Sequence, residues 1–161
     1  MAEERTSWIA TVDERRARIF RCTRTLRHGW HVEEHGVALR NIHEEDHERR
    51  RPAILGSGPH TMPPHEAGWG HEQQEEQRRF ARDVAHWLEE RLVRSEIDAL
   101  RVFAPARFLG LLREYLPERT RGTLRLMEGE LAQLRPHELA EHPAVRAALS
   151  PSPAPGPPAA E

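Results

Sequence analysis

The chain has 161 residues, a formal net charge of −2 and no lysine, so every permanent side-chain cation is an arginine. Its mean hydropathy is −0.77, and no apolar run approaches the ~20 residues of a membrane span, so we expect a protein that does not cross a membrane and has no membrane partner. A single cysteine, Cys22, excludes an internal disulfide framework. Because the amino terminus also lacks an apolar signal segment, we expect a cytoplasmic protein with one globular domain.

The first part of the chain predicts a β-hairpin and a third strand. Segments 7–12 and 17–23 are rich in β-branched and aromatic residues, and they flank a polar turn at 13–15. After a break at His28 and Gly29, segment 30–35 predicts a short third strand.

A long loop is predicted next, over residues 41–70, because prolines and glycines are frequent there and apolar residues follow no period. Residues 71–94 then predict a helix, since large apolar side chains recur on one helical face. These side chains are Phe80, Val84, Trp87, Leu88 and Leu92.

The second half of the chain alternates strands and helices. Strand 99–104 leads into a helix that begins near Pro105, and strand 123–127 leads into a last helix from Arg135. This order predicts an α/β fold with a mixed five-stranded sheet and helices on its faces. We expect one domain over residues 1–149 and a disordered Pro/Ala-rich tail over 150–161.

Two patterns suggest metal or nucleophilic chemistry, and both are weak. Residues 43–47 read His-Glu-Glu-Asp-His, the H-E-x-x-H pattern that binds zinc when a helix presents it. Composition alone produces roughly 0.1 such matches, and the following segment has no apolar face to anchor a helix. We therefore predict no metal and no cofactor, with His43 and His47 as the alternative metal ligands. Cys22 lies within a predicted strand, where core packing is favoured over a nucleophile.

Arginine distribution is the clearer signal. Residues 15–27 contain six arginines and no acid. Guanidinium groups match phosphate oxygens, although protection of a sheet edge is an equal alternative. A further arginine follows strand 99–104, near the strand end where α/β sheets bind ligands. The candidate phosphate contacts are Arg15, Arg16, Arg18 and Arg107.

Several segments resemble one bacterial family. Residues 104–113, Ala-Pro-Ala-Arg-Phe-Leu-Gly-Leu-Leu-Arg, resemble the A-P-P-R-F-L-G-x-L-R signature of the host attachment proteins, described as required for attachment to host cells. Segments 8–20, 60–62, 71–90 and 130–139 resemble other elements of this family in the same order, so the resemblance covers about residues 6–149.

This resemblance implies a fold and a class of partner. The family is similar to the middle domain of archaeal and eukaryotic peptide-chain release factors, which implies an RNase H-like fold. In release factors the loop before the long helix carries a Gly-Gly-Gln tip that enters the ribosome. Here that loop contains no Gly-Gly-Gln. Its recognition candidates are His60, Gly68 and Gly70.

We therefore expect a non-catalytic RNA-binding module, with the ribosome or tRNA as partner and no DNA specificity. One alternative is a hydrolase that uses loop histidines, with or without a metal. Another is a protein-binding adaptor that affects attachment.

Overall fold

Six strands form one mixed sheet in the computed structural model, which describes residues 5–43 and 66–150. The strand order is β3-β2-β1-β5-β6, and β4 also pairs with β2. Strands β1 to β4 pair antiparallel, whereas β1, β5 and β6 run parallel. The strands are β1 (Thr6–Val12), β2 (Arg16–Thr25), β3 (Gly29–Glu34), β4 (Leu39–Arg40), β5 (Leu100–Ala104) and β6 (Leu124–Glu128).

The predicted α/β fold with a mixed sheet is confirmed, and the number of strands is corrected from five to six. The strand missed was β4, whose two residues pair with the start of β2. Two residues are too few to show the alternation by which a strand is recognised in a sequence.

Among the described residues, three helical segments lie between strands and two helices follow the last strand. They are α2 (Glu66–Arg94), α3 (Ala106–Tyr115), the 3-10 turn η1 (Glu118–Thr120), α4 (Pro136–Glu141) and α5 (Pro143–Leu149). The single last helix predicted from Arg135 is therefore two helices. His142 separates them in an extended conformation, because the proline that follows disfavours helical backbone at the residue before it.

The long helix also begins earlier than predicted, at Glu66 instead of His71. Gly68 and Gly70, which we had placed in the recognition loop, thus lie in its first turns. Each glycine weakens a helix by about 1 kcal/mol relative to alanine. Propagation from the well-packed second half of α2 offsets this cost. Residues 44–65 of the predicted loop and 151–161 of the predicted tail lie outside the described residues.

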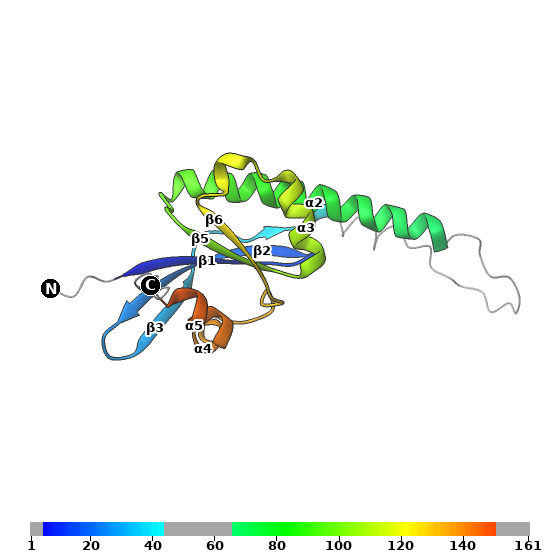
Figure 1. The fold of residues 1–161 in the computed structure, drawn as a ribbon. Helices are drawn as coiled ribbons and strands as arrows, with labels where there is room; N and C mark the ends of the chain where they lie inside the picture. The colour runs from blue at the N-terminus through cyan, green and yellow to red at the C-terminus, as the bar shows by residue number, and fades with distance from the viewer. Residues whose placement is uncertain (1–4, 44–65, 151–161) are drawn as a thin grey trace, which may run out of the picture.

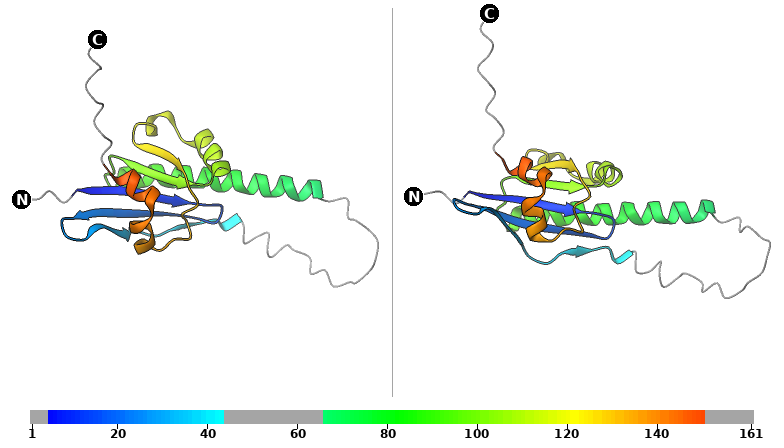
Figure 2. Two further views of the ribbon diagram at one scale, coloured as in Figure 1. Left: turned by 60° about the horizontal axis from the view of Figure 1, so that its bottom comes forward. Right: turned by 90° about the horizontal axis from the view of Figure 1, so that it is seen from below.

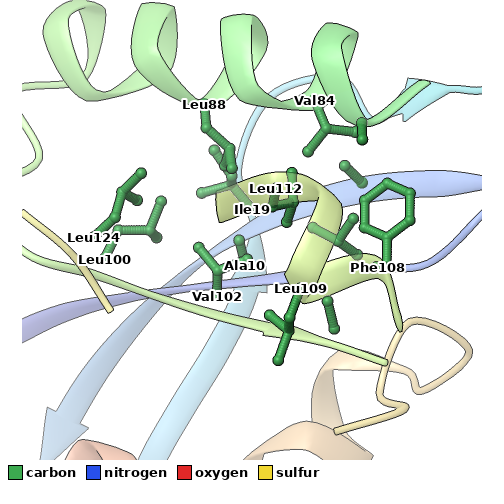
Figure 3. Close-up of a cluster of buried hydrophobic side chains, with 14 of the residues drawn as sticks. Ala10, Ile19, Val84, Leu88, Leu100, Val102, Phe108, Leu109, Leu112 and Leu124 are labelled. Carbon is green, nitrogen blue, oxygen red and sulfur yellow. The ribbon is translucent and has the colours of Figure 1, made fainter. Parts of the chain in front are cut away.

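Two layers of helices cover the two faces of the sheet (Figures 1 and 2). On one face, α2 and α3 enclose a core that Figure 3 shows, with Val84 and Leu88 of α2 above Ile19 of β2 and Val102 of β5. On the other face, α4 and α5 cover a second core, in which Leu139 packs with residues of the central strands. Along β1, β2 and β5, successive side chains therefore point alternately into one core and into the other.

The carboxyl ends of the parallel strands meet at one edge of the sheet. The carboxyl ends of β1, β5 and β6 lie together, and the first turn of α3 follows β5 at that edge (Figure 1). In α/β sheets this is the edge where ligands bind. Within the part of the chain that the structure describes, no helix is both long and apolar enough to cross a membrane.

Candidate functional site

A pocket of about 400 Å³ opens at the carboxyl edge of the parallel strands. Three segments that are distant in sequence line it: the β1–β2 turn, the start of α3 and the loop after β6. Its lining residues are Asp13, Glu14, Arg15, Pro105, Arg107, Glu130, Ala132 and Gln133. The pocket thus brings together Arg15 and Arg107, two of the four arginines that the sequence singled out.

The β1–β2 turn places Arg15 through a carboxylate cap. The Oδ1 atom of Asp13 accepts hydrogen bonds of 2.8 Å from the backbone N–H groups of Arg15 and Arg16. A second bond closes the turn, since the N–H of Asp13 donates to the carbonyl of Arg16 at 3.0 Å. Asp13 is therefore a structural carboxylate, and the turn it closes carries Arg15 to the pocket.

The start of α3 brings Arg107 to the same pocket. Pro105 precedes the first turn of the helix, and no acidic residue lies in that turn. The free backbone N–H groups of a helix N-terminus carry partial positive charge, which favours an anion. Arg107 is exposed and adds a full charge to that end of the helix.

The pocket also contains the carboxylates of Asp13, Glu14 and Glu130, so three acidic residues face two arginines and the formal charge of its lining is −1. Two guanidinium groups beside a helix N-terminus can bind an anion, and the carboxylates limit its affinity. None of the described lining residues is a serine, cysteine or histidine, so the pocket holds no nucleophile activated by an imidazole.

Arg18 has a structural role instead of the predicted phosphate contact. Its guanidinium makes two hydrogen bonds to Glu34, at 3.0 and 3.2 Å. It also donates to the carbonyls of Leu134 at 3.0 Å and Ala132 at 3.5 Å, and it lies 4.7 Å from the centre of the Phe20 ring. With only 11% of the side chain exposed, its donors are directed into the protein.

Arg16, the fourth candidate, lies at the start of β2 and is half-buried. It pairs with Arg40 of β4 through the backbone, and it does not line the pocket. The arginine-rich hairpin is therefore divided by the fold, and of its described arginines Arg15 is the one that lines the pocket.

The histidine candidates do not form a metal centre among the described residues, where no three potential ligands converge. The Nε2 atom of His43 lies 3.0 Å from a carboxylate oxygen of Asp83 on α2, so this imidazole has a hydrogen-bond partner within the protein. His47 and His60 lie outside the described residues. Gly68 and Gly70 are helical, as described above.

Cys22 is confirmed as a buried core residue. Burial raises the pKa of its thiol from 9.0 to about 12, and the nearby Arg101 opposes this only in part. Because the thiolate is the reactive form, we expect the native protein to react slowly with a disulfide reagent at about pH 8 and the unfolded protein to react fully. Fast stoichiometric labelling of the native state, followed by absorbance, would contradict this expectation.

The same pKa sets a direction for alkaline stability. Since the thiol pKa is higher in the folded state, the unfolded chain loses this proton first as the pH rises. The contribution of Cys22 to stability is complete below pH 9.0 and is lost between pH 9.0 and about 12. The difference in free energy of unfolding between the protein and its Cys22→Ala variant should therefore decrease as the pH rises through this range. Denaturant titrations at several pH values measure it.

Sequence reasoning missed the third side of the pocket. Glu130 and Gln133 come from the irregular loop after β6, where the N–H of Gly129 bonds to the carbonyl of Ala104 at 3.0 Å. The position of this loop at the carboxyl end of a parallel strand was the only available signal.

We compared the chain with known protein families and with curated proteins. None of the curated proteins compared with the chain matches it. The family described as "Protein required for attachment to host cells" matches residues 8–142, which include every strand from the middle of β1 onward and the complete carboxyl edge. The match covers more than half of the chain, and the chain therefore belongs to the host attachment protein family.

Proposed function

We propose that this chain is a cytoplasmic, non-catalytic RNA-binding module that associates with the ribosome or tRNA and binds a backbone phosphate in the carboxyl-edge pocket. The observation that supports this most is the meeting of Arg15 and Arg107 in one pocket at a helix N-terminus. The resemblance to release-factor middle domains supports RNA as the source of the phosphate.

The charges of the pocket set the expected strength of binding. A guanidinium group offers paired donors to two phosphate oxygens, and the helix N-terminus adds backbone N–H groups. The carboxylates of Asp13, Glu14 and Glu130 repel a polyanion and so oppose its binding. We therefore expect moderate affinity with a strong dependence on salt.

Replacing Arg107 tests the proposal. Because the side chain is exposed and outside the core, Arg107→Gln should leave the fold intact while removing one phosphate contact. We expect RNA affinity to fall about 5–10-fold, and the slope of log K against log salt to decrease by about 0.7–0.9. The measurement is fluorescence anisotropy with labelled tRNA, and sedimentation with ribosomes, on protein freed of nucleic acid.

Arg113→Gln is the matched control, because Arg113 is an exposed arginine in the last turn of the same helix. It removes the same charge away from the pocket and should bind RNA as the unmodified protein does. The proposal is wrong if the protein shows no salt-sensitive binding to tRNA or ribosomes, or if the two variants behave alike.

The family description favours a second candidate, a protein-binding adaptor that affects attachment. In that case a pulldown from cells would return a protein partner before and after RNase treatment. Loss of the partner with RNase would favour the RNA-binding module.

A further inference from the structure

A second group of arginines lies on the face of the sheet that α4 and α5 cover, toward the opposite end of the parallel strands. Two pairs form it, one on β5 and β6 and one where β1 begins and β2 ends. Arg101 and Arg125 are directly paired across β5 and β6. The N–H of Arg24 donates to the carbonyl of Arg5, which continues the β1–β2 pairing by one residue. We call these four residues, Arg5, Arg24, Arg101 and Arg125, the arginine cluster.

Strand alternation places all four side chains on one face. Arg101 pairs with Ile9, and Ile9 pairs with Phe20, so these three share a face. Phe20 and Cys22 belong to the core under α4 and α5, and Arg24 is the next alternate residue of β2. Small Ser7 lies between the two pairs, because it is the residue of β1 that pairs with Cys22.

The cluster has no acidic partner among the described residues. None of its four side chains forms an ion pair or hydrogen bond with the part of the chain that the structure describes. Other arginines of the same sheet are matched, since Arg18 pairs with Glu34 at 3.0 Å and Arg21 with Glu33 at 3.9 Å. The cluster therefore places four arginines without an ion pair among the described residues on one face of the sheet.

The lack of counter-charge is unfavourable for folding. Like charges directly opposite on neighbouring strands destabilise a sheet. Burial lowers the pKa of Arg101, and repulsion from Arg125 and Arg5 lowers it further, while Cys22 acts in the opposite direction. A bound anion would remove this repulsion.

An open pocket adjoins the cluster. Trp30 is the directly paired neighbour of Arg24, and it also lines a pocket of about 450 Å³ between β3 and the last two helices. His28, His137 and Arg146 line the same pocket, together with one carboxylate, that of Glu141. Its volume is in the range of ligand pockets, and its aromatic and imidazole groups offer flat surfaces for stacking.

We propose that this face binds single-stranded nucleic acid, with backbone phosphates on the arginine cluster and a base in the neighbouring pocket against Trp30. Proteins that bind single strands combine unpaired positive charge along the backbone with aromatic side chains that stack on bases. A chain of phosphates also fits an open surface with four separate guanidinium groups better than a small anion does. This surface shares no residue with the carboxyl-edge pocket, so the inference goes beyond the function proposed above.

The test uses the full chain, freed of nucleic acid, and a short fluorescently labelled single-stranded RNA. The double variant Arg101→Gln/Arg125→Gln removes two phosphate contacts. We expect its affinity to fall about 10-fold or more, and the salt slope to decrease by about 1.4, which is 0.7 for each contact. Since a repulsive pair is removed, the thermal midpoint should stay unchanged or rise.

Arg113→Gln/Arg121→Gln is the matched control, with the same loss of charge at exposed positions of α3 and the turn that follows η1. It should retain the affinity of the unmodified protein. If both double variants weaken binding equally, the effect is one of net charge and the proposal is wrong. If Arg107→Gln alone abolishes binding and the cluster variant binds normally, only the carboxyl-edge pocket binds RNA and the proposal is also wrong.

A second variant tests the base pocket. Trp30→Leu keeps an apolar side chain toward the core, and it should weaken RNA binding several-fold without changing the binding of inorganic tripolyphosphate. If tripolyphosphate competes as strongly as RNA and Trp30→Leu has no effect, the cluster is a polyphosphate site and the assignment to nucleic acid is overturned. Arg24→Gln provides a check that does not depend on Trp30, because it should weaken the binding of both ligands.

Discussion

Replacing Phe80 by alanine should lower the free energy of unfolding by about 3–5 kcal/mol, the range for large aromatic side chains removed from a core. Phe80 is fully buried on α2, and its ring lies 5.8 Å from the ring of Phe108 on α3. Alanine leaves a cavity between the two helices and the sheet, and it removes the ring pair as well. Urea unfolding followed by circular dichroism measures the change.

Val93→Ala on the same helix is the control for this prediction. Val93 is 77% exposed, so its truncation should change the free energy of unfolding by less than about 0.5 kcal/mol. A loss below about 1 kcal/mol for Phe80→Ala would contradict the packing of α2 on the sheet.

Replacing Arg18 by methionine should lower the free energy of unfolding by about 1.5–3 kcal/mol, the range for hydrogen bonds of a charged group, because it removes the bonds to the exposed Glu34 and to a half-buried carbonyl. The variant keeps a long apolar side chain over Phe20 but removes the hydrogen bonds to Glu34 and to the carbonyl of Leu134. These bonds connect the β2–β3 pair to the loop before α4. We therefore expect the second core to loosen first, with loss of protection from hydrogen exchange in α4 and α5.

Arg21→Met is the matched control, since it removes an arginine from the same strand. Arg21 pairs with Glu33 at 3.9 Å and both side chains are about half exposed, so the expected loss is about 0–1 kcal/mol. Equal losses for the two variants would contradict the structural role of Arg18. Under conditions where the Arg18 variant stays folded, its RNA affinity should remain nearly unchanged, because this guanidinium faces the protein.

The two arginine surfaces lie toward opposite ends of the parallel strands, and both depend on how the chain is ordered in the sheet. Arg107 reaches its pocket because β5 runs parallel to β1 and delivers the next helix to the edge of the β1–β2 turn. Arg101 and Arg125 meet because β6 pairs with β5 in parallel register. The two proposed anion sites of this chain therefore both depend on the parallel pairing of β1, β5 and β6.

Local patterns predicted most of the elements correctly. The strands of the first hairpin and β5 were recognised by their β-branched residues, and α2 by apolar residues such as Phe80 and Leu88 on one face. The errors fall where local signal is weak or misleading. The strand β4 has two residues, the start of α2 contains glycines, and His142 takes an extended conformation within an otherwise helical segment.

By itself the sequence determined the α/β class, the buried position of Cys22 and the place of Arg107 after a parallel strand, because hydrophobic period and turn residues act over a few neighbouring positions. Only the tertiary structure decided which arginines line a pocket and which support the fold. Arg15 and Arg18 are three residues apart and look alike in sequence, yet one lines a pocket and the other satisfies Glu34 and two carbonyls from a distant loop. The physical reason is that the environment of a guanidinium is set by strand pairing and by residues more than a hundred positions away, which no local pattern contains.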